Sequence, residues 1–205
     1  MLEVDWGIER PDPSRIDAVW QDASFDVVAL QASAVEEFVG AMAETRPRGD
    51  ARCCCVQIPE SPVIDWFAAR NCLADAGFFG HLLGAPTIAA ELDLDVSDAP
   101  EPTMTVESSL SLDGVLAEEL VYGGSVSYVD TAAEADDAFA RAKRLAERFR
   151  DLVVEERYEE VTVHRTREPW CEWFGEPTWN LTLVAVDRRH RWAWVLVATD
   201  EGCLE

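Results

Sequence analysis

The chain has 205 residues, 48% of them hydrophobic, which is enough apolar material for one sizeable core or two small ones. Forty acidic residues oppose 17 basic ones, so the net charge is -23 at pH 7. This charge argues against direct nucleic-acid binding, because phosphate recognition needs a basic surface. The chain has no apolar run of membrane-spanning length, and its first residues carry acids where a signal peptide carries bases. We therefore expect a cytoplasmic protein that contacts no membrane.

The acids are spread evenly. Nineteen lie in residues 1–102 and 21 in residues 103–205, so the acidity belongs to the whole surface and not to a tail. Three explanations remain open: the charge provides general solubility in a high-GC or salt-adapted cell, it docks a basic protein, or it mimics a nucleic acid. The second has a physical basis, since charge complementarity accelerates association with a basic partner and adds specificity.

The first half of the chain alternates strand and helix patterns. Residues 25–30 predict a strand, and Ser33 with Glu36 three residues later predicts the start of a helix that ends near Arg46. Residues 51–59 are apolar on both faces, which predicts a central strand. Three further patterns follow: a helix from Ser61-Pro62 towards Gly77, a loop or short helix at 78–84 with a packed, hydrogen-bonded His81, and a short helix from Pro86 to about Glu91.

Residues 93–102 are acidic and contain two prolines, which is the composition of a linker. We nevertheless expect residues 1–205 to form one compact domain, with this segment as a pseudo-boundary only. The reason is that the first half has too few strands to cover the strand predicted at 51–59.

The second half predicts further helices between strands. In chain order the patterns are a short strand at 104–106, a helix over Leu112–Leu120 ended by Gly123-Gly124, a strand at 125–129, a helix from Thr131 with Glu134 to Arg150, a strand at 158–165, and a hairpin of strands 178–186 and 191–199. Strand, helix and strand thus occur at 25–58 and again at 125–165. We predict an α+β fold: a mixed β-sheet with two strand–helix–strand units and a C-terminal antiparallel hairpin or meander.

An aromatic loop, residues 168–179, precedes the hairpin. Five of the eight tryptophans lie between His164 and Thr199, and within the loop aromatic residues alternate with acids. Tryptophan is enriched at interface hot spots, and an acid-rimmed aromatic patch suits an arginine-rich partner through ion pairs and cation–π contacts. We predict that these residues bind the partner: Glu168, Trp170, Glu172, Trp173, Phe174, Glu176 and Trp179. The alternative is that the rings seal the edge of the core.

The chain lacks the common catalytic and metal-binding motifs, including glycine-rich phosphate loops and the CxxC pairs of zinc sites. Three of its six cysteines, Cys53, Cys54 and Cys55, are consecutive. In a strand the first and third would point to one face and the second to the other, so the run cannot chelate one ion. We interpret these thiols as small buried side chains.

Two weaker candidates for chemistry remain. One is Cys171 as a nucleophile, with His164 or His190 as its base. The other is a carboxylate or metal site that combines a histidine with acids. The acids available for that site are Glu172, Glu176, Asp187 and Asp200. We assign no catalytic residue, no metal and no cofactor.

In size, charge and the absence of a catalytic signature, the chain resembles the immunity proteins of bacterial toxin systems. The resemblance implies that the chain neutralises a basic toxin domain, often a nuclease. The first hypothesis is therefore an acidic cytosolic binding protein that docks and inhibits a basic protein partner. A carboxylate- or metal-dependent hydrolase is the second hypothesis, and a non-catalytic homo-oligomeric scaffold is the third.

Overall fold

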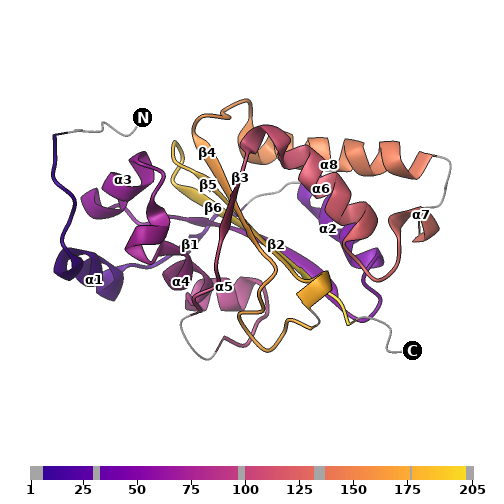
Figure 1. The fold of residues 1–205 in the computed structure, drawn as a ribbon, viewed down its shortest axis with the longest axis horizontal. Helices are drawn as coiled ribbons and strands as arrows, with labels where there is room; N and C mark the ends of the chain where they lie inside the picture. The colour runs from indigo at the N-terminus through magenta and orange to yellow at the C-terminus, as the bar shows by residue number, and fades with distance from the viewer. Residues whose placement is uncertain (1–6, 30–32, 97–99, 132–136, 176, 202–205) are drawn as a thin grey trace.

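The computed structural model describes residues 7–29, 33–96, 100–131, 137–175 and 177–201, and these residues build one six-stranded sheet (Figure 1). The strands lie in the order β1-β2-β6-β5-β4-β3. Their bounds are β1 Asp26–Val27, β2 Asp50–Gln57, β3 Thr105–Glu107, β4 Val161–Thr166, β5 Leu181–Asp187 and β6 Trp192–Thr199. The last three strands form a meander, and β2 joins it by pairing with β6 along its whole length.

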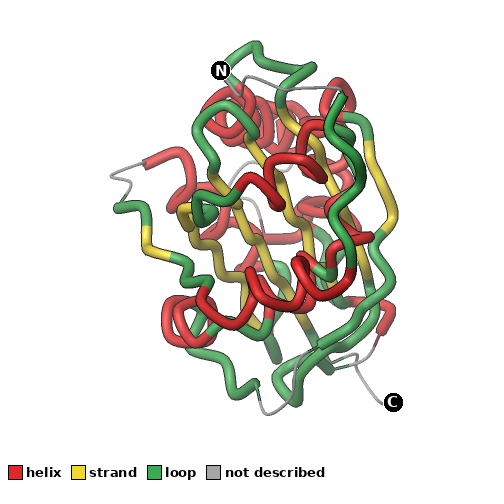
Figure 2. The backbone as a smooth tube through the Cα atoms, turned by 90° about the vertical axis from the view of Figure 1, so that its left-hand side faces the viewer, coloured by secondary structure: helices red, strands yellow, loops and turns green. Residues whose placement is uncertain are grey.

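Helices lie on both sides of the sheet, as Figures 1 and 2 show. One side carries α2 (Ser33–Glu44), α6 (Leu112–Tyr122), α7 (Tyr128–Thr131) and α8 (Ala138–Val154). The other side carries α1 (Pro13–Asp22), α3 (Pro62–Ala69), α4 (Phe78–Leu83) and α5 (Pro86–Glu91), with the 3-10 turn η1 (Leu73–Ala76). Within the described ranges, no helix has both the length and the apolar character needed to cross a bilayer.

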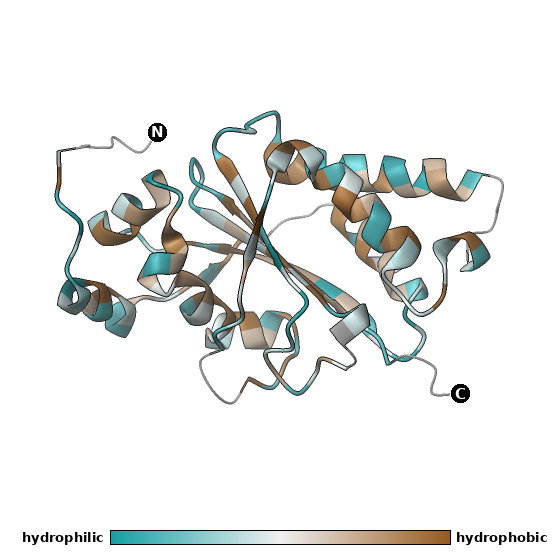
Figure 3. Ribbon diagram, in the orientation of Figure 1, coloured by the Kyte–Doolittle hydropathy of each residue, from teal (hydrophilic) through white to brown (hydrophobic). Residues whose placement is uncertain are grey.

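The sheet separates two hydrophobic cores, because alternate residues of a strand point to opposite faces. In β6, Trp194 faces α2, α6 and α8, whereas Val195 faces the other layer. In β2, Cys55 and Cys54 divide in the same way. Nearly every residue of β5 and β6 is buried, which explains why these strands are apolar throughout instead of alternating. Figure 3 shows the complementary pattern on α8, where hydrophobic and hydrophilic residues alternate around the helix.

Capping signals in the sequence fix where two helices begin. The Ser61 hydroxyl accepts a hydrogen bond from the Val63 backbone N–H at 3.2 Å, and Pro62 occupies the first turn of α3. The Asp12 carboxylate caps α1 in the same way, through the Arg15 N–H at 3.0 Å. Both helices are short, so their positions depend on these caps and on packing against the sheet.

The predicted α+β class and the C-terminal antiparallel meander are confirmed. A mixed sheet contains both parallel and antiparallel pairs of strands. Every pair of neighbouring strands in the described chain is antiparallel. The first strand–helix–strand unit exists as β1-α2-β2. The strand predicted at 125–129 is wrong: the Ser125 N–H donates to the Asp200 carboxylate instead of to a neighbouring strand, and α7 follows at once. The helix predicted from Thr131 to Arg150 corresponds to α8, whose described part begins at Ala138; Thr131 ends α7, and Glu134 lies outside the described residues.

Strands from both halves of the sequence share the sheet. β1 and β2 precede the segment 93–102, and the other four strands follow it. The pairing of β2 with β6 therefore joins the two halves directly. Whether residues 1–205 unfold as one cooperative unit stays a prediction.

Candidate functional site

The aromatic loop connects β4 to β5 and lies against the core beneath α3, α4 and α5. Phe174 is buried in that core at 8% exposure, and the rings of Trp170 and Trp173 lie 5.2 and 5.1 Å from its ring centre. The Trp170 Nε1–H donates to the Thr182 hydroxyl at 2.7 Å, which fixes this ring on β5. The three rings thus cover the core, while Trp170 and Trp173 keep part of their surface accessible.

The remaining predicted binding residues lie in different environments. Glu168 and Glu172 are exposed, and Trp179 is half-buried in the short 3-10 helix η4 (Pro177–Trp179). Glu176 lies outside the described residues. Three rings of the loop therefore pack against the core. That the seven predicted residues contact a partner stays a prediction.

Exposed carboxylates gather around the aromatic loop, because the chain after α5 runs beside it. The Thr103 N–H donates to the Glu168 carboxylate at 2.8 Å, and the charge of Asp95 acts on the Cys171 thiol. Five exposed acids result from this arrangement, and we name them the acidic rim: Asp93, Asp95, Glu101, Glu168 and Glu172. Within the described chain, Asp93 is the one member of the rim that forms an ion pair, with Arg52 at 3.6 Å.

Arg52 of β2 connects the rim to the loop. Its guanidinium donates to the backbone carbonyls of Leu92 and Asp93, both at 2.6 Å, and lies 5.1 Å from the centre of the Trp173 ring. It also pairs with Asp50 at 3.0 Å. This cation is engaged by the protein's own groups, so it leaves the neighbouring surface negative.

A buried ionic cluster, which the sequence did not predict, lies where α2, α6 and β4 end. Arg46 and Glu119 are 1% and 3% exposed, and Arg165 and Arg167 pair with Glu119 from the end of β4. Burial raises the pKa of Glu119, although the charges of the three arginines oppose the shift. Burial lowers the pKa of Arg46 to about 10, so this arginine stays charged at pH 7. Arg46, Glu119 and the two arginines at the end of β4 come from three distant parts of the chain and form no motif.

The turn between β5 and β6 holds a carboxylate–imidazole pair. Oδ2 of Asp187, a residue with 0% exposure, lies 2.7 Å from Nδ1 of His190 and 2.6 Å from the Arg157 guanidinium. Burial raises the pKa of Asp187, but hydrogen bonds from His190 and Arg157 outweigh burial, and the net pKa is lowered. With Nδ1 held by a carboxylate, the Nε2 of an imidazole is the position that accepts a proton. No described serine, threonine or cysteine side chain hydrogen-bonds to His190.

The other candidates for chemistry are not assembled. His164 is 7% exposed, its ring centre lies 4.6 Å from that of Phe79, and burial lowers its pKa to about 4. Burial raises the pKa of the Cys171 thiol, and neither His164 nor His190 contacts this thiol in the described chain. Among the described residues, no three histidine, cysteine or acidic side chains are arranged to hold a metal ion.

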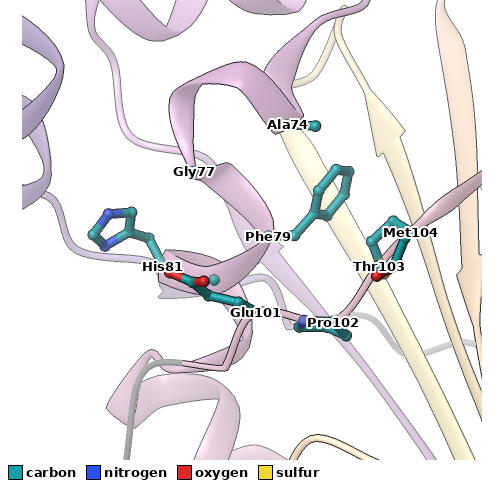
Figure 4. Close-up of a pocket in the computed structure, with 9 residues that line it drawn as sticks. Ala74, Gly77, Phe79, His81, Glu101, Pro102, Thr103 and Met104 are labelled. Atoms are coloured by element: carbon teal, nitrogen blue, oxygen red, sulfur yellow. The ribbon is translucent and has the colours of Figure 1, made fainter. Parts of the chain in front are cut away.

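His81 corrects a prediction. We expected a packed, hydrogen-bonded histidine, but the side chain is exposed and its ring stacks on Trp20 at 4.5 Å. In the part of the chain that the structure describes, three cavities of about 540, 490 and 390 Å³ border this imidazole. Figure 4 shows the first of them. The prediction of a packed histidine rested on the apolar residues next to His81 in the sequence. Its actual neighbour, Trp20, comes from the distant helix α1 and was not predicted.

Comparison with known proteins gives no relative. No protein-family model matches the chain, no curated protein matches it, and no solved structure matches it.

Proposed function

We propose that this chain is an acidic, cytoplasmic binding protein that docks a basic protein partner and inhibits it, as a toxin-neutralising immunity protein does. The docking surface consists of the aromatic loop and the acidic rim. One observation supports the proposal above the others: the half-buried ring of Trp173 is fixed beside Phe174 and lies among exposed carboxylates, most of which have no ion-pair partner in the described chain.

The two components of this surface have different physical roles. Exposed ion pairs contribute at most about 1 kcal/mol each, so the acidic rim by itself steers a basic partner and holds it loosely. A tryptophan that becomes buried in an interface contributes roughly 2–4 kcal/mol, so Trp173 provides the anchor. Because the Trp173 ring is already packed against the core, little side-chain freedom is lost when a partner covers it.

Binding kinetics on two variants test the proposal. The candidate partner is a basic protein encoded by a neighbouring gene or recovered by affinity capture. Trp173→Ala should accelerate dissociation, because it removes the buried anchor. Glu172→Gln should slow association, because it reduces the steering charge, and added salt should reproduce this effect and leave dissociation unchanged.

The matched control is Glu44→Gln, an exposed carboxylate at the end of α2 on the opposite side of the sheet. This variant has the same change of charge as Glu172→Gln, and its association rate should be closer to that of the wild type. A melting curve accompanies each variant. If Trp173→Ala lowers only the melting temperature and leaves dissociation unchanged, the ring belongs to the core and the docking surface is wrong.

A second candidate function is hydrolysis, and the Asp187–His190 pair favours it. A buried carboxylate that orients an imidazole is the arrangement of a general base, which would activate water or a substrate hydroxyl through Nε2. A panel of ester and phosphodiester substrates tests this candidate. Turnover by the wild type that is lost in His190→Ala and retained in Cys171→Ala supports hydrolysis; no turnover of any substrate removes it.

The third hypothesis, a homo-oligomeric scaffold, also stays a proposal. Self-association would bring together two molecules that each carry a net charge of -23, which is unfavourable at low ionic strength. The molar mass in solution, measured at low and at high salt, decides this point.

A further inference from the structure

The strongest remaining feature of the molecule is the groove that surrounds His81. The cavities of about 540 and 490 Å³ meet at Gly77 and His81, which line both. The larger one continues to Thr103, whose N–H donates to Glu168 of the acidic rim, so the groove opens beside the proposed docking surface. Figure 4 shows Phe79 on one wall of this cavity and Glu101 and Pro102 along the other.

Two glycines allow the groove to form. Gly77 has a φ of 68°, in the left-handed region that favours glycine, and it ends η1 and begins α4 within one residue. A side-chain carbon placed on Gly80 would lie 2.8 Å from the Pro100 carbonyl oxygen. Because Gly80 has no side chain, the segment that carries Glu101 crosses close to α4 and borders the cavity.

The imidazole of His81 is fixed by stacking, but its ring nitrogens have no hydrogen-bond partner among the described residues. One face stacks on Trp20 with an angle of 15° between the rings, and the Trp20 Nε1–H is itself fixed by the Ala76 carbonyl at 2.6 Å. The side chain is exposed, and no hydrogen bond to another described residue engages its ring nitrogens. Partial burial lowers the pKa of His81, while the charge of Asp17 raises it in opposition, so the ring is neutral at pH 7. A rigid, neutral aromatic face is therefore available to a ligand.

The surroundings of this face select the charge of a ligand. Asp17 and Glu101 are exposed carboxylates on the two sides of His81. The neighbouring cation, Arg10, is paired with Asp75 at 3.1 Å. Beyond Glu101 the larger cavity has an apolar wall, formed by Phe79 and by Met104. Apolar walls, an aromatic face and unpaired carboxylates together fit a long aliphatic stem that ends in a planar cation.

We propose that the His81 groove binds an arginine side chain of the basic partner, with its guanidinium stacked on the imidazole and its charge balanced by Glu101 and Asp17. This inference rests on the proposed function, since it names the chemical group by which the partner is recognised. A guanidinium is planar and weakly hydrated, so it stacks on a ring better than the compact, strongly hydrated ammonium of lysine. The groove therefore distinguishes arginine from lysine, whereas the acidic rim attracts both.

Nuclear magnetic resonance tests the groove without any partner. The probes are N-acetyl-arginine amide, its lysine counterpart and its uncharged citrulline counterpart, each titrated into the full-length protein at pH 7. The signals of the His81 ring and of the Trp20 indole report binding. Arginine should bind about two- to fivefold more tightly than lysine, the difference expected from one exposed cation–π contact. Citrulline should leave both signals unchanged.

Three variants locate the preference. His81→Ala should remove the preference for arginine over lysine, and His81→Phe, which keeps an aromatic face, should retain it. Glu101→Gln should weaken the binding of both the arginine and the lysine probe. The control, Glu44→Gln on the opposite side of the sheet, should weaken the binding of neither. His81 is exposed, so the fold should persist in these variants, and the backbone amide spectrum verifies this.

Any of three results overturns the inference: no shift of the His81 and Trp20 signals with arginine, equal affinity for arginine and lysine, or a preference that survives in His81→Ala. The failure of this inference is distinguishable from failure of the proposed function. The probes need no partner, whereas the docking surface is tested separately by the kinetics of Trp173→Ala and Glu172→Gln.

Discussion

The guanidinium of Arg52 lies over the indole of Trp173, 5.1 Å from the ring centre, and thereby links the second strand of the sheet to the aromatic loop. One face of this tryptophan is thus occupied from within the protein. A partner has access only to the remaining edge and face, which limits the anchor to a small, rigid contact. The same guanidinium holds the Leu92 and Asp93 carbonyls, so the loop and the chain carrying the rim share one support.

Arg52→Met should loosen both sides of the candidate surface. Hydrogen bonds from a charged donor contribute about 1.5–3 kcal/mol, so we expect the free energy of unfolding to fall by roughly 2 kcal/mol in urea titrations. Amide exchange in residues 92–95 should accelerate. Arg144→Met is the control, because both side chains of the Arg144–Asp137 ion pair are exposed. This variant should change the free energy of unfolding by at most about 0.5 kcal/mol. Equal losses in the two variants would contradict the role assigned to Arg52.

Glu119→Ala should be severely destabilising. The substitution breaks the pairs of Glu119 with Arg165 and Arg167 and removes a charge that stabilises the buried Arg46 cation, and breaking a buried pair costs about 3–5 kcal/mol. A second substitution, Arg46→Met, should recover part of the loss, because it removes the buried cation. Glu118→Ala, the exposed neighbour, should change stability by no more than about 0.5 kcal/mol in the same urea titration. A small effect of Glu119→Ala would show that the cluster contributes little.

Asp187→Asn should weaken the fold in a manner that depends on pH. The folded-state pKa of Asp187 is lowered, so its contribution is complete above the unfolded value of about 3.9 and is lost as pH falls through the folded pKa. At pH 7 we expect a loss of about 3 kcal/mol, because Arg157 loses its buried partner. The difference between variant and wild type should shrink from about pH 5 to about pH 2. A difference that is independent of pH would rule out this linkage.

The consecutive cysteines should behave as structural thiols. Cys53, Cys54 and Cys55 are free, and burial raises the pKa of Cys54 to about 12, so this thiol is protonated and unreactive at pH 7. Alkylation should be slow in buffer and fast in denaturant. Replacing each cysteine with alanine should reduce stability by at most about 3 kcal/mol, since a small cavity results. Stoichiometric zinc that is lost on one of these substitutions would overturn the interpretation.

Residues 1–98 should not fold alone. β2 has most of its pairing with β6, which this fragment lacks, and the fragment retains only the two-residue strand β1 as a partner. We expect no cooperative thermal transition in the isolated fragment, and we expect the halves of a chain cleaved in 93–102 to co-purify. A cooperative transition in the fragment would show that the chain contains two separable domains.

The sequence predicted those elements whose signals are local. The helix from Ser33, the strand near 51–59, the start of α3 at Ser61-Pro62 and the final hairpin all agree with the structure within a few residues. Each carries its own cap, turn or apolar run, so no distant contact is needed to form the pattern. The strand predicted at 125–129 failed because a distant carboxylate, Asp200, takes the N–H of Ser125.

Sites built from distant residues were harder to predict. The aromatic loop was recognisable from its composition, but the sequence did not show that Phe174 is buried while Trp173 stays half-exposed. Arg46 follows the end of α2 and Glu119 lies on α6, while Trp20 and His81 lie on α1 and α4, so their proximity depends on the packing of whole layers. No spacing rule within one element reports such contacts.

The place of β2 beside β6 also sets the order of events during synthesis. Residues 50–57 leave the ribosome long before residues 192–199, yet these two segments are hydrogen-bonded neighbours in the sheet. Until the last strand emerges, the apolar β2 lacks its main partner and has one edge open to other chains. Pairing of β2 therefore waits until residues 192–199 have been synthesised, and closure of this long loop makes the process slow. We therefore expect a nascent chain that ends before residue 192 to expose this strand edge, and to aggregate more readily than the full chain.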